Sequence, residues 1–469
     1  MNHKYNRKDT KDLLYLYETL SKKGIEVNLL EIDFLNLITH LETGYNLSEA
    51  IEVADHGLAK FKFSPLLHTC KARLLIDHGQ EELAFESLDR AEVFGQSFIE
   101  TDILRAKAHL SLNEVKDAQE IIYDLKFSYH TTETERSNIL YVEALIHEQE
   151  DRYDSMYTCL EEAVGLNPFN EEALQKLYIA VELAKKHEES VVLHNFVLDE
   201  NPYSHTAWFN LAQAHYFLLA YEEALDAFEY AFITNARFEP AYKEYAEVCF
   251  SLKLYQKALD ALEDALGYFE ADEELLLKIG QCYEYLGKTA KAKIFYYRAL
   301  NFNDMADEVY FHIGECYSKE GEYTSSLHFY KQAIDIDDLR EDYLMALAKS
   351  YCQVGRYQKA LPLFQKATEM GPELSANWVE YAWFLVKIGG LQEALEAIEE
   401  GEENSYGADL YYCKAAILFK MEDRTGALDA LGEALMVDFE DKELFFSYLP
   451  MYRKDKDVRA IIKYYSVEV

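Results

Sequence analysis

The sequence predicts an all-α solenoid of antiparallel helix pairs, and three observations support this prediction. First, the 469-residue chain aligns with itself at a step of 34 residues, from residue 31 almost to its end. Second, small residues recur at three fixed places in successive repeats. Third, glycine and proline recur where such repeats need their turns. A period of this length is typical of proteins in which stacked units share one continuous core.

The repeat register divides the whole chain. Residues 1–30 are expected to form an N-terminal helical cap or arm, and residues 31–136 the first three repeats, with a short insertion in the polar run TTETER. Two irregular repeats follow over 137–204, repeats 6–12 over 205–441, and a pair of capping helices over 442–469. The full repeats begin at residues 31, 65, 99, 137, 171, 205, 239, 273, 307, 341, 375 and 408.

Each repeat is expected to contain two amphipathic helices that cross closely. Large apolar residues recur at helical spacing within the repeats. Small residues occupy the eighth, twentieth and twenty-seventh places, which are Gly280, Ala292 and Ala299 in the repeat at 273. Because a small side chain lets two helix backbones approach, these places predict where the helices of a pair cross.

Turn residues mark both ends of the second helix in each repeat. The fifteenth place, where the first helix is expected to end in a left-handed residue, is glycine in several repeats, and asparagine or aspartate in two others. These residues are Gly79, Gly287, Gly321, Gly355 and Gly389, with Asn113 and Asp151. Prolines at the thirty-second place, Pro168, Pro202 and Pro372, are expected to stop the second helix.

The chain is strongly acidic, which limits the partners it is expected to bind. It has 46 Lys and Arg against 85 Asp and Glu, a net charge of −39. Such a surface repels nucleic-acid phosphates and anionic lipid headgroups, whereas it attracts basic protein segments. We therefore expect a protein or peptide partner, no nucleic acid and no insertion into a membrane. The oligomeric state is left open.

Cysteine use and the start of the chain favour a cytoplasmic protein. The seven cysteines never form Cys-x-x-Cys and lie in apolar helical stretches, so they are expected to be buried, reduced thiols. Reduced thiols indicate a reducing compartment. No apolar run of secretory length follows the basic residues at the start, and nowhere do roughly 18 apolar residues run together.

Motifs for catalysis or cofactor binding are not found in the sequence. The segment from Gly280 to Thr289 ends like a phosphate-binding loop but has six residues between its glycines where the motif requires four. The histidines include no His-Glu-x-x-His and no pair four residues apart, the spacing that brings two imidazoles to one metal. A Gly-x-Ser-x-Gly elbow is also missing. We therefore expect no enzyme activity, no catalytic residue, no cofactor and no metal site.

The repeat at 205–238 resembles the tetratricopeptide repeat family. It carries the family's pattern of Trp, Leu, small, Ala, Phe and Ala residues, departing only in His215, where Tyr is usual. The matching residues are Trp208, Leu211, Ala212, Ala224, Phe228 and Ala231. The resemblance, which covers residues 31 to about 467, implies about twelve repeats with a C-terminal capping helix pair. It also implies a right-handed superhelical solenoid whose concave surface is lined by the first helix of each pair.

If the resemblance applies, the fifth, ninth and twelfth places of each first helix face the concave surface. In the early repeats these places include Ile103, Arg73 and Lys107. The most aromatic stretch lies between residues about 205 and 390, and its residues form the expected peptide- or ligand-binding set: Phe209, Gln213, Tyr216, Lys243, Glu247, Phe250, Gln281, Phe311, Glu315, Met345, Lys349 and Trp383. Two alternatives remain open, because these residues either line an open groove or are buried between helices by tight curvature.

An apolar stripe with polar groups between its members is typical of a surface that holds an extended peptide or a partner helix. The sequence therefore predicts a non-catalytic scaffold or adaptor that holds an extended or helical partner segment in its concave groove, and the acidic body favours a basic segment. The alternative is a regulatory protein that senses a peptide or ligand and changes its superhelical conformation on binding.

Overall fold

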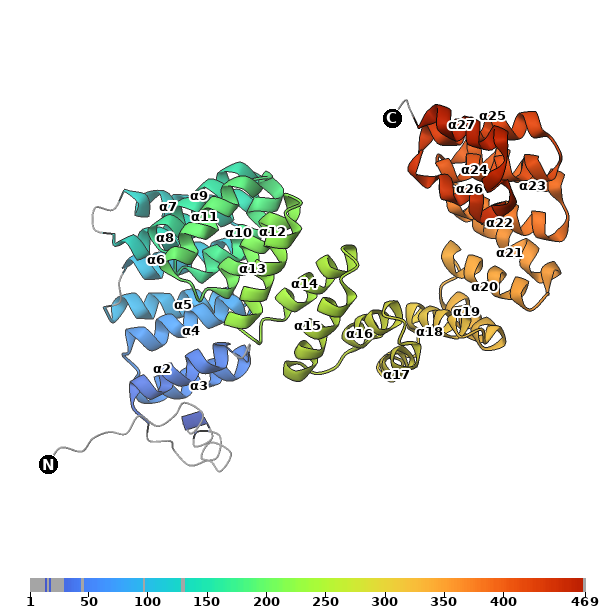
Figure 1. The fold of residues 1–469 in the computed structure, drawn as a ribbon. Coiled ribbons are helices and arrows are strands. Elements are labelled where there is room, and N and C mark those ends of the chain that lie inside the picture. The colour runs from blue at the N-terminus through green and yellow to red at the C-terminus, as the bar shows by residue number, and fades with distance from the viewer. Residues whose placement is uncertain are drawn as a thin grey trace. The chain divides into compact units, whose positions relative to one another are not determined.

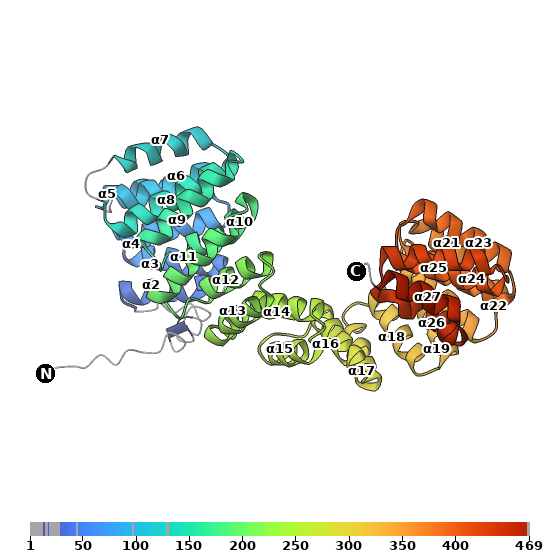
Figure 2. The same cartoon turned by 45° about the horizontal axis from the view of Figure 1, so that its top comes forward.

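All regular secondary structure is helical in the part of the chain that the computed structural model describes, which is residues 13–14, 17, 29–43, 46–95, 98–127 and 131–466. The helices follow one another as pairs joined by short turns (Figure 1, and from a second direction Figure 2). This confirms the predicted all-α solenoid of helix pairs. The expected N-terminal cap at 1–30 lies almost wholly outside the described residues.

The chain divides into two compact units, residues 1–248 and residues 249–469, and we describe each by itself. The division falls within α14 (Glu239–Ser251). Before it, the first unit contains the pairs α2 (Glu31–Thr43) and α3 (Leu47–Lys60), α4 (Pro65–Asp77) and α5 (Glu81–Val93), α6 (Phe98–Ser111) and α7 (Val115–Lys126), α8 (Glu133–Gln149) and α9 (Tyr153–Leu166), α10 (Glu171–Ala184) and α11 (His187–Glu200), and α12 (His205–Phe217) and α13 (Tyr221–Thr234).

The second unit continues the same pattern and ends in two shorter helices. After α15 (Tyr255–Tyr268), its pairs are α16 (Glu273–Tyr285) and α17 (Thr289–Ala299), α18 (Asp307–Lys319) and α19 (Tyr323–Ile336), α20 (Glu341–Gln353) and α21 (Tyr357–Met370), α22 (Ser375–Ile388) and α23 (Leu391–Asn404), and α24 (Ala408–Lys420) and α25 (Arg424–Val437). The last helices are α26 (Glu443–Tyr448) and α27 (Lys456–Tyr465), with 3-10 turns η1 (Glu440–Lys442) and η2 (Pro450–Lys454) beside them.

First helices begin at the predicted repeat starts, except α6, which begins one residue earlier, and α8, which begins four residues earlier. The polar run before residue 137 therefore lengthens α8 by a turn. Thr132 caps this turn by accepting a hydrogen bond from the backbone N–H of Glu135, whose carboxylate bonds back to the backbone of Thr132. Such a capping box satisfies two N–H groups that a helix start otherwise leaves unpaired.

The turns within the pairs confirm the prediction of left-handed residues at the fifteenth place. Gly287 has a φ of 73°, Asn113 of 61° and Asp151 of 55°. Other repeats place a residue with a larger side chain in the same conformation, among them Leu219 with a φ of 61°. A bulky residue rarely adopts this conformation without support from its surroundings, so the sequence alone did not reveal it.

Side-chain sizes at the eighth and twenty-fourth places of a repeat are complementary, because the smallest residue at the eighth place goes with the largest ring at the twenty-fourth. Gly280 lies against the ring of Tyr296, and Gly314 against the ring of Tyr330. Both rings are buried, with 0% and 1% of their surface exposed. Repeats with alanine at the eighth place have Leu, Ile or Phe at the twenty-fourth. The predicted small places are therefore points of close helix contact.

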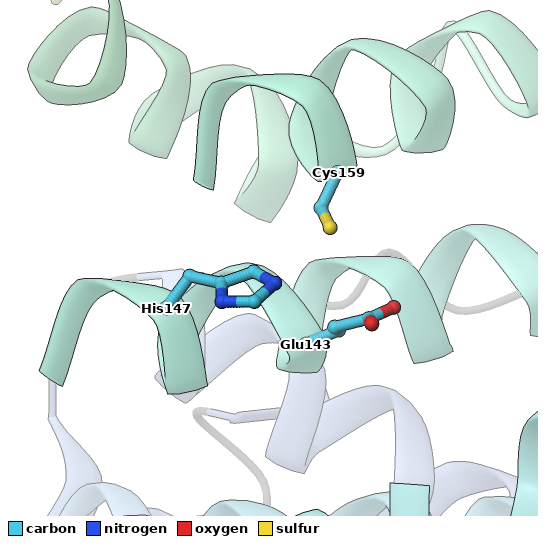
Figure 3. Close-up of side chains that lie close together, drawn as sticks. All are labelled: Glu143, His147 and Cys159. Carbon is cyan, nitrogen blue, oxygen red and sulfur yellow. The ribbon is translucent and has the colours of Figure 1, made fainter. Parts of the chain in front are cut away.

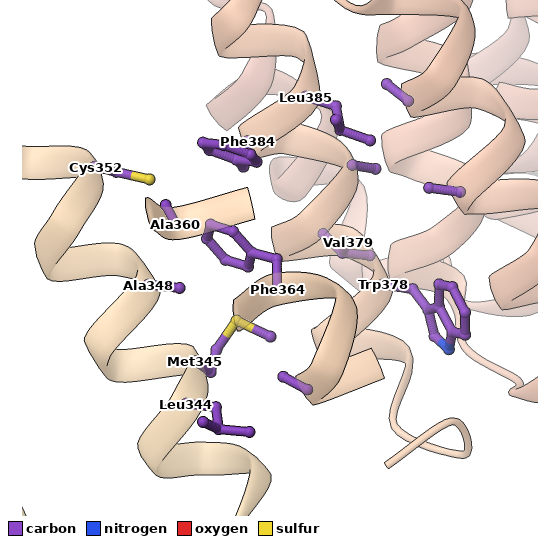
Figure 4. Close-up of a cluster of buried hydrophobic side chains, with 14 of the residues drawn as sticks. Leu344, Met345, Ala348, Cys352, Ala360, Phe364, Trp378, Val379, Phe384 and Leu385 are labelled. Atoms are coloured by element: carbon purple, nitrogen blue, oxygen red, sulfur yellow. The ribbon is translucent and has the colours of Figure 1, made fainter. Parts of the chain in front are cut away.

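Aromatic rings fill the space between one pair and the next. In the second unit, Phe364 of α21 lies between α20 and α22 (Figure 4). Its ring centroid is 4.7 Å from that of Phe384, and Met345 and Ala348 line the side formed by α20. Because a packed ring removes a large apolar area from water, these contacts stabilise the stacking of one pair on the next.

Candidate functional site

In the first unit, the first helices of four successive pairs line one pocket of about 320 Å³, which we call the first-helix pocket. Helix α6 contributes half of the lining residues, and α4, α8 and α10 contribute the rest. The lining residues are Arg73, Glu100, Ile103, Leu104, Lys107, Glu135, Asn138 and Glu172. Ile103 is at a fifth place and Arg73 and Lys107 are at ninth places, the positions that the repeat register assigns to the concave surface.

Both basic residues of the pocket are engaged in ion pairs. The ammonium group of Lys107 donates to both carboxylate oxygens of Glu172 at 2.8 Å, which links α6 to α10 across α8. The guanidinium group of Arg73 donates to both oxygens of Glu42 at 2.9 and 3.1 Å. The ring of Tyr141 lies 4.9 Å from the Lys107 ammonium. The pocket therefore presents oriented charges of both signs close to an aromatic surface.

Carboxylates outnumber cations around the first-helix pocket. The pocket is lined by three carboxylates, Glu100, Glu135 and Glu172, and by two basic residues, Arg73 and Lys107. Burial and nearby carboxylates also raise the pKa of the Tyr141 hydroxyl. The local charge has the same sign as that of the whole chain, and it favours a ligand with basic groups.

In the first unit, the predicted binding residues have very different exposures. Phe209 is half-buried among three neighbouring rings, with centroids 5.3 to 6.0 Å away. Gln213 is buried, whereas Tyr216 has 37% of its surface exposed. Lys243 pairs with a glutamate one turn earlier at 3.0 Å, and Glu247 is exposed.

Predicted aromatic residues of the second unit make contacts with adjacent repeats. Phe250 meets the ring of Tyr285 edge-on at 6.2 Å. Phe311 stacks on Tyr343 at 4.7 Å, and Trp383 is half-buried. Each of these rings thus combines a packing contact with some remaining exposure.

The predicted polar and aliphatic residues of the second unit are mostly engaged by neighbours. Glu315 accepts a hydrogen bond from the Tyr330 hydroxyl at 2.6 Å. Lys349 pairs with Glu380 at 2.8 Å, and Met345 is buried with 6% of its surface exposed.

Gln281 belongs to a buried polar network in the second unit. Glu284, only 3% exposed, accepts hydrogen bonds from the Tyr296 hydroxyl and the Lys319 ammonium, both at 2.7 Å. His312 Nδ1 is 2.9 Å from the same carboxylate, and its Nε2 is 3.0 Å from the Gln281 amide. These partners offset the desolvation cost of the buried carboxylate, so removing one of them would destabilise the packing of these helices.

Metal-ligating atoms also converge in the first unit, at two places within the described residues. One group is largely exposed and the other partly buried, and each brings its ligand atoms within 4.8 Å of one another: His109, Glu114 and Asp117, and Glu143, His147 and Cys159. The sequence search, which required two histidines four residues apart, missed the glutamate and histidine that have this spacing on α8.

Two further expectations can be compared with the structure. The segment that resembled a phosphate-binding loop is the end of α16, a turn at Gly287 and the start of α17, so it has the geometry of the other repeat turns. None of the described helices is long and apolar enough to cross a membrane.

Comparison with known families identifies the repeats. The model of the tetratricopeptide repeat matches residues 137–170, 273–304 and 307–338, and a second model of this repeat matches residues 344–375. The chain is a tetratricopeptide repeat protein. Three of the matched segments begin at predicted repeat starts, and the repeats support a general role in protein–protein interaction.

Solved structures that are similar to this tetratricopeptide repeat chain share low sequence identity with it. YrrB, described as having an unusual peptide-binding site, is 22% identical, with 39% of this chain and 95% of YrrB covered and a TM-score of 0.33. A tetratricopeptide repeat protein from Parabacteroides merdae is 15% identical, with coverages of 56% and 99% and a TM-score of 0.43. In the Cut9–Hcn1 hetero-tetramer the matched chain is 13% identical, with coverages of 97% and 96% and a TM-score of 0.39. No curated protein matches the sequence.

The tetratricopeptide register explains part of the first-helix pocket. It places Ile103 and Lys107 on the expected face, but Asn138 and Glu172 are at second places, which the sequence reasoning did not consider. Their shared place in successive repeats is the signal that could have identified them.

Proposed function

We propose that this protein is a non-catalytic scaffold or adaptor that holds a segment of a partner protein against its first helices. The observation that carries the proposal is the first-helix pocket, in which four successive repeats contribute side chains to a volume of about 320 Å³. An extended or helical segment can contact several repeats at once, which gives a repeat surface its affinity.

The chemistry of the pocket favours a basic segment. Ile103 and Leu104 offer an apolar wall, and Asn138 offers an amide that can bond to a peptide backbone. Glu100 and Glu135 add negative charge beside them, so a lysine or arginine flanked by an aliphatic residue would complement this surface.

Aromatic residues at the equivalent places of later repeats are proposed as additional contacts. Phe209 and Tyr216 would serve in the first unit, and Phe250, Phe311 and Trp383 in the second. Aromatic side chains commonly dominate binding energy because they remove much surface from water at small entropic cost.

The proposal can be tested with peptides selected from a random phage-displayed library on the full chain. The dissociation constant of a selected peptide is then measured by calorimetry for the wild type and for the double variant Glu100→Gln with Asn138→Ala. Loss of an attractive charge and of an amide contact is expected to weaken binding of a basic peptide by about tenfold or more. The substitutions neutralise an exposed carboxylate and remove a partly exposed amide, so the melting temperature should change little.

A matched control replaces the same residue types on second helices. Glu120 of α7 and Asn195 of α11 are exposed and lie outside the pocket. Glu120→Gln with Asn195→Ala should bind the peptide as the wild type does. Selected peptides that bind both double variants equally would contradict the proposed surface.

A further inference from the structure

Three metal-ligating side chains meet in the fourth repeat, and none of them lines the first-helix pocket. Glu143 and His147 are one turn apart on α8, and the thiol of Cys159 extends from α9 toward them (Figure 3). All three side chains are partly buried, and their ligand atoms lie within 4.8 Å of one another. Two neighbouring helices thus bring a carboxylate, an imidazole and a thiol to one point.

His147 has a ring nitrogen that its surroundings leave unsatisfied. Its Nδ1 is buried and has no hydrogen-bond partner within the described part of the chain. Buried polar atoms nearly always have a partner, so this nitrogen requires an explanation. Burial also lowers the pKa of His147, which favours the neutral imidazole, the form that binds a metal.

Regular repeats fill the corresponding space differently. His147 and Cys159 are at the eleventh and twenty-third places of their repeat. In the repeat at 273, the same places hold Tyr283 and Phe295, which stack with centroids 5.5 Å apart, and the repeat at 307 has the same stacked pair of residue types. The fourth repeat therefore replaces a pair of stacked rings by two metal-ligating groups.

A cavity of about 290 Å³ adjoins these groups and has Glu143 and His147 in its wall. It has room for a water molecule, which catalytic and other open zinc sites use as the fourth ligand. Lys126 donates to both oxygens of Glu143, at 2.8 and 2.9 Å. A carboxylate can bind a metal through one oxygen while a hydrogen bond to the other holds it in place.

We propose that Glu143, His147 and Cys159 bind one Zn²⁺ ion, with water from the cavity as the fourth ligand. Nitrogen, oxygen and sulfur donors together suit zinc, whereas magnesium and calcium prefer oxygen alone. Tetrahedral coordination requires ligand atoms about 3.5 Å apart. Since the ligand atoms already lie within 4.8 Å of one another, side-chain rotations that move each atom by at most about 1 Å would bring them to this distance.

The charges in this site balance when the thiol loses its proton. Burial raises the pKa of Cys159 to about 12, and Glu143 adds to this effect, so the free thiol is neutral. On binding, the S–H proton passes to solvent and a zinc–sulfur bond forms, without oxidation or reduction. One thiolate and one carboxylate then neutralise the dication. Lys126 and Arg152 also line the cavity and repel a cation, so we expect weaker binding than in zinc sites with four protein ligands.

The test uses the full chain freed of metal with a chelator. Zn²⁺ is titrated by calorimetry, and Co²⁺ is used as a spectroscopic probe because a cobalt–thiolate bond gives a charge-transfer band in the near ultraviolet. We expect one site, a thiolate band in the wild type, and loss of that band in Cys159→Ser. Zinc affinity should fall by more than about 100-fold in Cys159→Ser and in His147→Gln, since even outer-shell changes cost up to this much.

Matched controls use the same residue types elsewhere. His215 is at the eleventh place of its own repeat, where Ala227 occupies the place of Cys159, and Cys70 is another partly buried thiol. His215→Gln and Cys70→Ser should therefore bind zinc as the wild type does. If Cys159→Ser does not fold, Glu143→Gln provides the same comparison. A wild type that gives no cobalt–thiolate band, or a Cys159→Ser variant with unchanged zinc affinity, overturns the proposal.

Discussion

Replacing Gly314 by alanine is expected to destabilise the second unit, although alanine is the better helix former. A Cβ atom at this position would lie 2.6 Å from two ring atoms of Tyr330, whereas ordinary contact begins at 3.4 Å. The ring would have to move by about 0.8 Å in a close-packed interior, while its hydroxyl is held by Glu315 at 2.6 Å. Overpacking costs about 1–3 kcal/mol, and removing a helix glycine contributes only about 0.5–1 kcal/mol.

The expected net loss is therefore about 1–2 kcal/mol in the free energy of unfolding, measured by urea denaturation followed by circular dichroism. Gly267, which has no atom within 4 Å of an added Cβ, is the control, and Gly267→Ala should stabilise by up to about 1 kcal/mol. The double variant Gly314→Ala with Tyr330→Phe reproduces the residue types of Ala348 and Phe364 and should recover part of the loss. If Gly314→Ala stabilised the chain as much as Gly267→Ala does, the close ring contact would be refuted.

Three other predictions test packing, protonation and charge. Ala292→Leu should overpack a fully buried helix crossing and lower the free energy of unfolding by about 1–3 kcal/mol, and an unchanged urea midpoint would contradict the assigned register. Burial opposes protonation of His312, but hydrogen bonds with Glu284 and Glu308 outweigh it and raise its pKa to about 9. The stabilisation from this charged histidine is full below the unfolded pKa of about 6.5 and is lost as the pH rises through about 9. Between these pH values, the free energy of unfolding measured with urea should therefore fall more steeply with pH for the wild type than for His312→Gln. Parallel curves for the two proteins would exclude a charged pair. Raising salt from about 50 to 500 mM should slow association of a basic peptide, measured by stopped flow, far more than its dissociation, and a salt-independent association rate would leave only apolar contacts as the recognition surface.

The repeat period made most of the fold predictable from sequence. A small residue such as Ala292 is uninformative once, but its recurrence at the same place in successive repeats identifies a helix crossing. Prediction failed where the surrounding structure imposes a conformation that the residue type does not favour. Leu219 is left-handed because the following helix must turn back, and the polar residues before 137 are helical because Thr132 and Glu135 cap one another.

The candidate sites were less predictable because they depend on contacts between repeats. The places of Ile103 and Lys107 follow from the register, but the link from Lys107 to Glu172 spans 65 residues and requires the curvature of the stacked helices. Gln281 has the sequence character of a surface residue, and its amide is nevertheless engaged by a histidine in the next repeat. The spacing of Glu143 and His147 is visible in the sequence, whereas Cys159 joins them only through the packing of α9 on α8.

Ion pairs between adjacent repeats differ from one junction to the next, whereas the small and aromatic packing residues are shared by nearly all repeats. The seventh place of a repeat pairs with the twenty-eighth place of the repeat before it, as in Arg105 with Glu92 at 2.8 Å and Glu143 with Lys126 at 2.8 Å. Each pair is partly exposed and contributes at most about 1 kcal/mol, so these pairs do not hold the stack together. The two charges exchange places between these junctions, because the basic residue is at the seventh place in the first pair and at the twenty-eighth place in the second. If the repeat at 137 stacked directly on the repeat at 65, Glu143 would face Glu92, and two carboxylates would repel each other. Nearly every repeat has the small and aromatic packing residues, so these residues cannot specify the order of the repeats. The reversed ion pairs can contribute to it, because an array that omits the repeat at 99 would be destabilised by the repulsion between Glu143 and Glu92.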